Sequence, residues 1–581
     1  MFLRSVKAAN GRHEYLRLVE NFRQGEKTRQ RVVLHIGRKD LLAPHLDALV
    51  RLLQADQPDP TWVSREQVSA PQSWTWGPLL VARHLFDSLS LSGLLDAPAP
   101  FSRHRQPLSE RVFPLVANRL TRPGSEHALA GWLEDFYVVT AQGQRWLPEW
   151  KQSRRVKVSF EQLRLGYETL DELLARKEDL EVGVWQQLRD LFSMEPELVF
   201  YDITSTYFEG QGPAELGKFG YSRDGKPRNR QIVVGVVMME GWPIAHHVFA
   251  GNRLDQTTVA EVVQDLRQRF GLGRVVFVGD RGMVTLQNVE HLRGEGQGYL
   301  VGLQRRNRKD VPEYIEQAEA RGPWQECPVG ISAAEKTPPP RTRVCEVRGK
   351  EPGVRVFVVH SQEREQYERG MRELSMERVR KDLEALRLRV EKGELKEAEK
   401  IGAAAAKTLA RNHGHRYFGW ELRRNQFHYF PHPVNFPREQ VCEGKYVIQT
   451  EEPNLSSVEA VATYKQLNEV ERGFAHLKGL TDVRPVYHHK DDRVRAHVLV
   501  AALALLLDRA LEKKLRAAGS TLSSPAAWQA LETVRCVQMQ IGERTKLYVT
   551  RGSRQAAEVL QILRLAELDP PEPIRQKSPM W

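Results

Sequence analysis

The chain has two aspartates at positions where strands of a sheet are expected. Asp202 lies inside the run Leu198–Thr204, whose β-branched and aromatic residues are typical of a strand. Charged residues are rare in such a strand unless a partner or a metal ion compensates them. Asp280 lies where a second apolar run, Arg274–Val278, stops, and the ends of strands are where ligands bind in open sheets. Each aspartate taken alone is equally well explained as a helix cap or a turn residue.

A glutamate, Glu471, supplies a third acid on one face of an expected helix. Five residues recur at spacings of three and four and therefore share that face: Tyr464, Leu467, Glu471, Phe474 and Lys478. Because Leu467 and Phe474 are apolar, we expect this face to be buried and Glu471 to point inward. Three neighbours are expected to point elsewhere: Glu469, Arg472 and His476.

Three carboxylates gathered in one place need a compensating cation, since like charges raise one another's pKa. Divalent ions meet this need, because Mg²⁺ takes oxygen ligands and keeps waters and substrate phosphate oxygens. Two ions about 3.5–4 Å apart can stabilise both the attacking and the leaving oxygen of phosphodiester cleavage. The alternative is a buried ion pair of Glu471 with Lys478 or an arginine. Lys478 lies roughly 10 Å further along the helix axis, which is too far for an easy direct pair.

Several blocks of the sequence resemble one family of enzymes. They are similar to the insertion-sequence DDE transposases that carry a Tyr-Arg-Glu-Lys signature, Y-x(2)-R-x(3)-E-x(6)-K. Tyr464, Glu471 and Lys478 stand at three of its positions, and Leu467 stands at the arginine position. Further blocks that resemble the family are Tyr201–Ser205, Gly220–Asp224, Gly251-Asn252, Asp280–Met283 and Arg484–His488. The resemblance covers roughly residues 196–510, and the N-terminal basic segment is similar as well.

The resemblance implies an RNase H-like core with an insertion between the second aspartate and the glutamate. It implies that Asp202, Asp280 and Glu471 bind two Mg²⁺ (or Mn²⁺) ions and so cut and join DNA. The 191-residue separation of Asp280 and Glu471 leaves room for the insertion. Tyr464 and Lys478 are implied to hold phosphates of the DNA end, for which a lysine is suited as a point charge.

Four more residues are assigned to DNA binding. Arg472 or Arg484 would replace the family arginine that is missing at Leu467, and Thr204 lies beside the first aspartate in its block. Relatives often pass through a hairpin at the element end, which needs a base flipped out and stacked on an aromatic side chain. Trp324 in the insertion is the candidate for that stacking, with ordinary packing as the alternative.

The elements that must position these residues follow a recognisable order. Between residues 196 and 303 we expect three strands, a helix, a strand, a helix and a strand, which together make a mixed sheet with helices packed on it. This order matches the RNase H-like fold. The expected elements are strands Leu198–Thr204, Gln231–Val237, Ile244–Phe249, Arg274–Val278 and Tyr299–Leu303, with helices Thr257–Phe270 and from about Val284.

The whole chain is expected to be a multidomain α/β protein, because one core seldom exceeds about 250–300 residues. Six segments are predicted: a basic β-rich DNA-binding module at 1–40, a helical DNA-end-binding region at 41–195, the first part of the core at 196–309, an α+β insertion at 310–455, the second part of the core at 456–515, and a helical region with a tail at 516–581.

Two helical patterns outside the core leave alternatives open. Gly77–Ser88 and Ser109–Leu120 are expected to be helices that form either a helix-turn-helix or a bundle without DNA. The highly charged stretch Arg364–Arg411 carries one apolar stripe, expected to pack within its own domain rather than in an intermolecular coiled coil. The stripe consists of Val379, Leu383, Leu386 and Val390.

Charge points to a polyanionic partner. The formal net charge is +12, and the first 39 residues hold ten Lys and Arg against three Glu, which is more than half of that excess. The N-terminal segment is therefore interpreted as contacting DNA, with a solvated basic hairpin as the alternative. The expected partners are double-stranded DNA with inverted-repeat element ends, target DNA, and a second copy of the chain on the DNA.

Other sequence features exclude some classes of protein. The four cysteines lack zinc-site spacing, and their scarcity fits a reducing compartment. The longest apolar run, Val498–Leu507, falls short of the ~20 residues that span a bilayer and is expected to be a buried helix. No signal peptide is recognised, so we expect a cytoplasmic, nucleoid-associated protein of a bacterium or archaeon without membrane contact. Two alternatives remain open, an RNase H-like nuclease that does not join DNA and a catalytically silent DNA-binding regulator.

Overall fold

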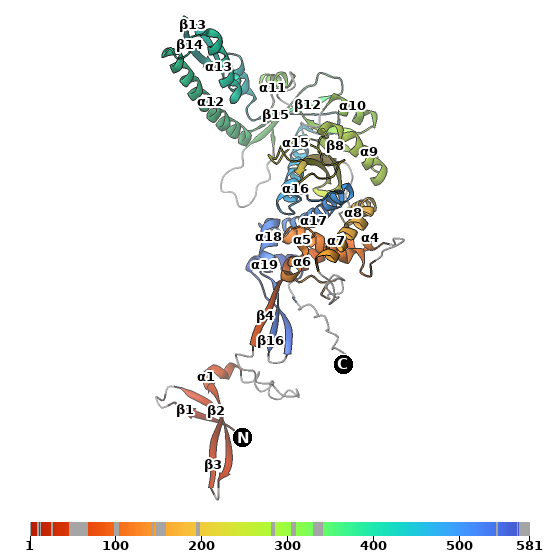
Figure 1. The fold of residues 1–581 in the computed structure, drawn as a ribbon, viewed down its shortest axis with the longest axis vertical. Helices are drawn as coiled ribbons and strands as arrows, with labels where there is room; N and C mark the ends of the chain where they lie inside the picture. Colours follow the sequence, from red (N-terminus) through yellow and green to blue (C-terminus); the bar gives the residue numbers. More distant parts are fainter. Residues whose placement is uncertain are drawn as a thin grey trace. The chain divides into compact units, whose positions relative to one another are not determined.

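The structure is a computed structural model that describes most of the chain (Figure 1). Two compact units are distinguished, Met1–Pro71 with Met539–Lys546, and Gln72–Gln538 with Leu547–Trp581. Asp280, one of the three predicted catalytic acids, falls outside the described residues. The described residues are 2–8, 11, 13–24, 27–45, 68–97, 104–140, 145–146, 158–192, 198–279, 285–303, 310–328, 341–541, 544–565 and 568.

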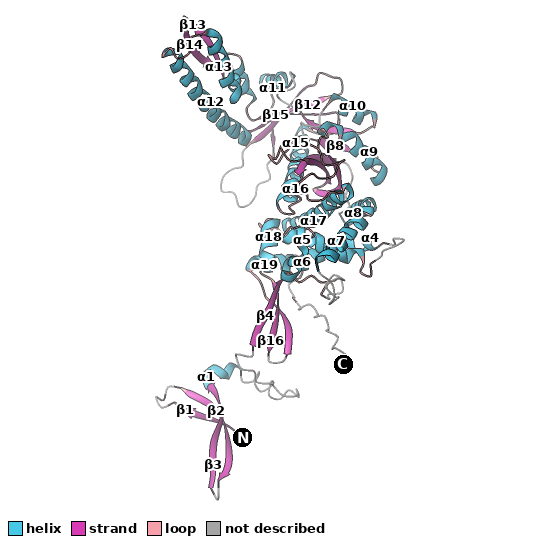
Figure 2. Ribbon diagram, viewed as in Figure 1, coloured by secondary structure: helices cyan, strands magenta, loops and turns pink. Residues whose placement is uncertain are grey.

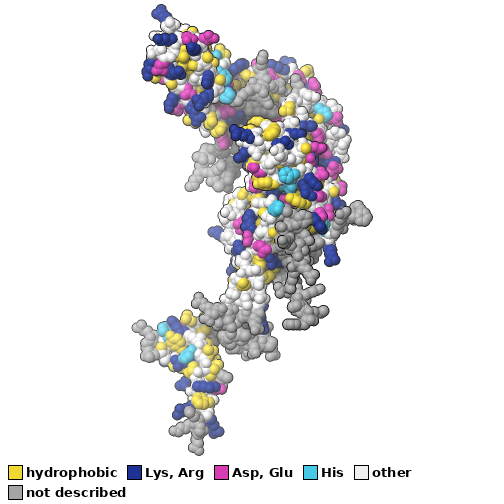
Figure 3. Space-filling model, viewed as in Figure 1, with side chains coloured by type: hydrophobic (Ala, Val, Ile, Leu, Met, Phe, Trp, Pro, Cys, Tyr) yellow, Lys and Arg dark blue, Asp and Glu magenta, His cyan; other side chains and the backbone are white. Residues whose placement is uncertain are grey.

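The first unit contains a three-stranded antiparallel sheet that confirms the β-rich character predicted for the N-terminal segment. Its strands are β1 (Phe2–Lys7), β2 (Glu14–Gln24) and β3 (Lys27–Arg38), in the order β1-β2-β3. The turn between β1 and β2 includes Gly11 with φ +68, a conformation that glycine adopts without strain. Lys and Arg side chains gather toward the tip of the β2–β3 hairpin (Figure 3), so the excess charge is displayed on an exposed surface. The sheet is followed by α1 (Lys39–Leu42) and a short 3₁₀ turn, Ala43–His45.

Helices form a bundle before the central sheet, and the structure overturns one interpretation of it. The helix expected at Ser109–Leu120 is α5, and residues Leu108–Leu120 of α5 are all buried. This helix packs among α3, α4, α7 and α17, so it offers no free face to the groove of DNA. The helix-turn-helix alternative is therefore wrong for α5, and bundle packing is what the structure shows. The helices are α3 (Gly77–Ser88), α4 (Leu91–Asp96), α5 (Leu108–Thr121), α6 (Leu129–Asp135), α7 (Val158–Ala175) and α8 (Lys177–Phe192).

A mixed sheet lies at the centre of the second unit. Its first three strands are antiparallel neighbours, β5 (Leu198–Tyr207), β6 (Gln231–Met239) and β7 (Trp242–Ala250). They form because their residues are mostly β-branched or aromatic, and every residue of β6 is buried. A strand buried on both faces needs cover on both sides, and helices provide it (Figure 2).

Two crossovers complete the core of the sheet. Helix α9 (Val259–Phe270) leads to β8 (Val276–Gly279), which runs parallel to β5, and α10 (Leu286–Gly294) leads to β9 (Gly298–Gly302), which runs parallel to β8. The resulting strand order is β9-β8-β5-β6-β7. A three-stranded antiparallel meander whose first strand is extended by two parallel strands is the RNase H-like arrangement, so the predicted fold class is confirmed.

The insertion continues this sheet rather than building a separate one. Strand β15 pairs antiparallel with β9, and β12, β11 and β10 follow outward, which brings the sheet to nine strands among the described residues. Helix α11 (Asp310–Arg321) packs on the added strands. The added strands are β10 (Gln325–Cys327), β11 (Thr342–Arg348), β12 (Arg355–Ser361) and β15 (Lys445–Thr450).

A helical arm follows β12. The 30-residue α12 (Gln362–Glu391) packs against α13 (Ala398–Arg411) and a hairpin of β13 (Phe418–Arg423) and β14 (Gln426–Pro431). The predicted apolar stripe of α12 is buried against residues of these elements, including Ile401 and Phe427. The stripe therefore packs within its own domain, as expected. Helix α14 (Asn435–Cys442) leads back to the sheet.

The C-terminal part returns to the core. Helices α15 (Ser457–Lys465) and α16 (Leu467–Gly479) precede α17 (Asp491–Ala517), which contains the apolar run expected to be a buried helix, and that run is buried except for one half-buried alanine. Among the described residues, no helix is long and apolar enough to cross a membrane. The remaining elements are α18 (Ser524–Leu531), α19 (Arg554–Ile562) and a sheet of β4 (Val68–Thr75), β16 (Arg535–Ile541) and β17 (Arg544–Val549) in the order β17-β16-β4.

Candidate active site

Asp202 lies on the central strand β5, on the face that α16 covers. Side chains alternate between the two faces of a strand, so Asp202 shares its face with Phe200. Phe200 belongs to a core cluster with Leu467 and Val470 of α16, whereas Tyr201 belongs to the core on the opposite face. Asp202 is half-buried, and its carboxylate accepts a 2.7 Å hydrogen bond from the backbone N–H of Ile203. The carboxylate therefore faces the layer in which the predicted glutamate helix lies.

Glu471 is carried by α16, but the structure corrects the predicted orientation. The buried residues of α16 are Leu467, Val470, Gly473, Phe474 and Leu477. The centre of this stripe lies near Val470 and Leu477, so Glu471 sits at its edge and is exposed. The prediction that Glu471 is buried was wrong because Leu467 and Phe474 alone do not fix the centre of the apolar face. Because water solvates an exposed carboxylate, the protein can fold without a cation that compensates the charge of Glu471.

Asp280, the second predicted aspartate, lies outside the described residues, but the residue before it is described. Gly279 is the last residue of β8, and Asp280 follows it directly in the sequence. β8 is the parallel neighbour of β5, with Phe200 paired to Val278. The described chain therefore leads to Asp280 along the strand beside the one that carries Asp202.

Lys478 and Arg484, both predicted to bind DNA, meet at one buried carboxylate. The Asp224 carboxylate forms a 2.9 Å ion pair with Nζ of Lys478 and a second ion pair with the guanidinium of Arg484. The Asp224 side chain is 4% exposed and that of Lys478 is 13% exposed. Burial lowers the pKa of Lys478, and the bond to Asp224 opposes that shift. Two cations around one anion leave this cluster with a net positive charge.

Arg472 is placed apart from that cluster. Its guanidinium pairs with Glu469 at 3.0 Å, and Glu469 in turn accepts a 3.2 Å bond from the buried Arg509. Glu512 and Arg516 complete this network. Of the two candidates for the missing family arginine, the structure places Arg484 beside Lys478 and Arg472 in a separate ion-pair network.

The other three predicted DNA-binding residues lie on different elements. Tyr464 is on α15, which is separated from α16 by Gln466, and its ring stacks on Tyr446 with centroids 5.8 Å apart. The five-residue face thus spans two helices rather than one. Thr204 is buried in β5. Trp324 is half-buried, with the guanidinium of Arg343 4.9 Å from its ring centroid, which fits the packing alternative.

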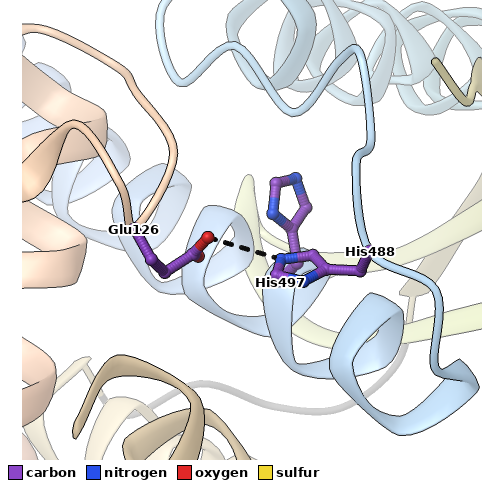
Figure 4. Close-up of side chains that lie close together, drawn as sticks. All are labelled: Glu126, His488 and His497. Carbon is purple, nitrogen blue, oxygen red and sulfur yellow. Dashed lines mark ion pairs between the residues drawn. The ribbon is translucent and has the colours of Figure 1, made fainter. Parts of the chain in front are cut away.

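A separate buried cluster consists of Glu126, His488 and His497 (Figure 4). Nε2 of His488 lies 3.6 Å from the Glu126 carboxylate. Burial alone would raise the pKa of Glu126, but the hydrogen bond from His488 and the surrounding positive charges bring the pKa well below its usual range. Within the described part of the chain, these three form the group whose ligand atoms lie close enough to hold a metal ion.

Hydrogen bonding explains that cluster without a metal. Nδ1 of His497 accepts a 3.2 Å bond from the guanidinium of Arg119, and Nε2 donates to the carbonyl of Val483 at 3.0 Å. Both ring nitrogens are therefore occupied. Arg119 also donates to the carbonyl of Asp482 at 3.2 Å. The cluster thus holds the backbone of residues 482 and 483, which precede Arg484 in the chain.

Two family models match the chain. The model described as "Transposase DDE domain" matches residues 195–507, more than half of the chain. The chain belongs to the DDE transposase family. The N-terminal domain model of the IS1634 family transposases matches residues 3–61, which supports an insertion-sequence member of that family.

A solved piggyBac transposase synaptic complex with hairpin DNA is 10% identical, with a TM-score of 0.33, and the alignment covers 78% of this chain and 79% of that one. Comparison with curated proteins found no match.

Three residues of the site and its surroundings were not predicted from the sequence: Asp224, Arg119 and His497. Asp224 belongs to the block Gly220–Asp224, which was recognised as family-like but not given a role. The sequence does mark Asp224, since the segment from Lys218 to Arg230 contains five basic residues and Asp224 is its only acid. For Arg119 and His497 no sequence signal exists, because 378 residues separate the two.

Proposed function

We propose that this DDE transposase cuts the ends of an insertion sequence and joins them to target DNA, with Asp202, Asp280 and Glu471 as the metal-binding catalytic acids. The observation that carries the proposal is the relation of Asp202 to α16. The half-buried acid on the central strand faces the helix on which Glu471 stands at an open edge. A site for phosphodiester chemistry needs acids that hold ions on one side and an opening for DNA on the other.

The donor set fits two Mg²⁺ or Mn²⁺ ions. Carboxylate oxygens are the ligands that such hard cations prefer, and the two described acids lie on rigid elements, a central strand and a helix. When bound, the ions would supply an activated water and neutralise the charge that develops on the phosphate. Asp202 and Glu471 would orient these ions, with Asp280 as the third ligand.

Lys478 and Arg484 are proposed to hold the phosphates of the element end. Their shared partner Asp224 brings the two cations together, and phosphates would compete with it for them. Tyr464 and Thr204 are kept as weaker DNA-binding candidates, together with Arg472 and Trp324. The proposed partners are double-stranded element ends and target DNA, bound by a homodimer of a cytoplasmic, nucleoid-associated enzyme.

The decisive experiment compares two glutamates on α16. Glu471→Gln keeps the size of the side chain and loses the negative charge that would hold a divalent ion, so it should abolish cleavage of a labelled duplex carrying the inverted repeat that flanks the coding region. Binding of that duplex should persist, because phosphate contacts come from other residues. Glu469→Gln, on the ion-pair side of α16, should cleave normally. Normal cleavage by Glu471→Gln, or equal loss in both variants, contradicts the catalytic assignment.

A second readout separates joining from cutting. Pre-cut element ends with a free 3′-OH, mixed with supercoiled plasmid and Mg²⁺, should yield joined products with the wild-type protein. Asp202→Asn should yield none. Cleavage without any joined product would show a nuclease instead of a transposase, and the absence of both with intact DNA binding would show a silent regulator.

A further inference from the structure

The loop between β5 and β6 exposes two aromatic rings beside the candidate site. Phe219 is 63% exposed and Tyr221 is 78% exposed. Exposing two large aromatic rings two residues apart is unfavourable in water and is common where a partner covers them. Neither ring belongs to the core clusters of the described residues.

The loop that carries the rings is held in one conformation. Lys218 and Gln231 exchange two backbone hydrogen bonds, of 3.2 and 2.7 Å, and the N–H of Gly251 donates to the carbonyl of Leu216 at 3.0 Å. A Cβ at Gly220, between the two rings, would overlap the carbonyl oxygen of Gly251, so the backbones touch there. The rings are thus displayed on a fixed platform, which reduces the entropy lost when a ligand stacks on them.

The platform is tied to both elements of the candidate site. The N–H of Arg223 donates to the hydroxyl of Ser205 at 2.9 Å, three residues after Asp202 on β5. The next residue, Asp224, pairs with Lys478 on α16. The rings therefore lie on a loop that contacts both the strand that carries Asp202 and the helix that carries Glu471.

The charges around the rings select a polyanion. The segment Lys218–Arg230 has five basic residues and one acid, and that acid is the buried Asp224. Three of the basic side chains are exposed: Lys218, Lys226 and Arg228. The guanidinium of Arg230 lies 5.8 Å from the ring centroid of Phe219, and that of Arg223 lies 5.7 Å from the ring centroid of Tyr221. Aromatic rings interleaved with cations suit a nucleic-acid strand, whose phosphates meet the cations while its bases stack on the rings.

We infer that Phe219 and Tyr221 form a stacking platform for unpaired bases of the DNA strand that enters the candidate site. Bases inside a duplex are already stacked on their neighbours, so only an unpaired or flipped base offers its face to the rings. The inference rests on the proposed function for the origin of that strand. It assigns base stacking to this loop instead of Trp324, whose ring is half-buried beneath Arg343.

The test isolates base stacking from phosphate binding. The full-length protein is titrated with a fluorescent thymidine strand of about 16 nucleotides and with an abasic strand of the same length, which has the phosphates but no bases. The wild-type protein should prefer the thymidine strand. Tyr221→Ala and Phe219→Ala should each reduce that preference roughly 5-fold or more, since stacking contributes about 1–3 kcal/mol per base. Affinity for the abasic strand and the salt dependence of binding should stay unchanged.

Two further variants define the outcome. Tyr221→Trp should restore the thymidine preference, because a larger ring stacks at least as well. Tyr367→Ala removes a tyrosine that is 68% exposed on the charged helix α12, and should leave the preference at the wild-type value. An unchanged preference in Tyr221→Ala, or a change in oligomeric mass in sedimentation instead, overturns the inference. The assay needs neither metal nor cleavage, so a failed cleavage experiment with a reduced preference would contradict the proposed activity alone.

Discussion

Replacing Asp224 by asparagine should act on stability and on DNA binding in opposite directions. Asp224 holds Lys478 and Arg484 through one carboxylate oxygen, and its side chain is 4% exposed. Asparagine has nearly the same size and keeps one oxygen that accepts a hydrogen bond, so the packing of the loop is preserved. The change removes a single negative charge from between two cations.

The loss of stability follows from how deeply the three groups are buried. Removing one partner of a fully buried ion pair costs about 3–5 kcal/mol, whereas exposed pairs contribute about 0.2–1 kcal/mol. The Lys478 side chain is 13% exposed, so its pair with Asp224 resembles a buried ion pair. The Arg484 side chain is 32% exposed, so its pair is screened by solvent. Because asparagine retains one hydrogen bond, we expect the free energy of unfolding to fall by about 2 kcal/mol. Urea titration followed by tryptophan fluorescence measures this loss.

The effect on DNA is expected to have the opposite sign. With Asp224 neutral, both cations are free to meet phosphates, which adds about one effective positive charge to the binding surface. The plot of log affinity against log salt should therefore steepen by up to about 0.9, and affinity for duplex ends at low salt should rise. Fluorescence anisotropy at several salt concentrations measures this slope.

A matched control separates local from global charge. Asp190→Asn adds the same charge at a side chain that is 71% exposed and pairs only at 3.3 Å with its neighbour Arg189, so its stability should stay within about 0.5 kcal/mol and its slope should not change. If Asp224→Asn weakens both stability and DNA affinity, the aspartate serves the DNA site as an organiser and not as a competitor. If neither quantity changes, the cluster is not part of the DNA-binding surface.

Three further predictions concern the surroundings of the site. Deleting residues 1–39, which carry the basic β-sheet module, should flatten the salt dependence of DNA binding, and an unchanged slope would contradict the role of that module. Glu469→Gln removes one partner of Arg509, which is 2% exposed, and should lower the free energy of unfolding by about 1–2 kcal/mol in urea titrations while DNA cleavage persists. The pKa of His497 is lowered by burial and by the charges of Arg119 and His488, against the opposing charge of Glu126, so the folded protein leaves it neutral while the unfolded chain protonates it near pH 6.5. Stability should therefore fall as pH drops from 7 to 5.5, by at most about 1.4 kcal/mol per pH unit for this histidine, and His497→Gln should make that fall shallower.

The central strands could be predicted from sequence because their signal is local. Runs of β-branched and aromatic residues mark β5 through β9, and the expected run Gln231–Val237 lies within the observed β6. The pairing of strands is a different matter. β15 joins β9 although about 150 residues separate them, and the pairing uses backbone hydrogen bonds that leave no mark on composition. The sequence therefore predicts the strands of the insertion but not that they extend the core sheet.

The candidate site shows the same limit. Asp202 could be identified because it is the only charged residue of β5, which is a local feature. Asp224 stands out in the sequence as the one acid of a basic segment, but its two partners could not be predicted, since they lie 254 and 260 residues away and each is an ordinary basic residue by itself. The helical face of Glu471 was predicted from spacing, but the depth of each position depends on what packs against the helix. Val470 and Leu477 proved to lie at its centre.

The exposure of Glu471 is compatible with its proposed role as a metal ligand. A buried glutamate would need a cation to compensate its charge, whereas the exposed Glu471 does not. A carboxylate that must reach a phosphodiester in duplex DNA has to stand where the duplex can approach, because the backbone of DNA cannot enter a closed core. Glu471 stands at the edge of the buried face of α16, and Lys478, seven residues on, lies on the same side of that helix within the cationic cluster. The exposed Glu471 and the mostly buried Lys478 therefore lie on one side of a helix that packs over the strand carrying Asp202, which is consistent with the proposed cleavage of a bound DNA end.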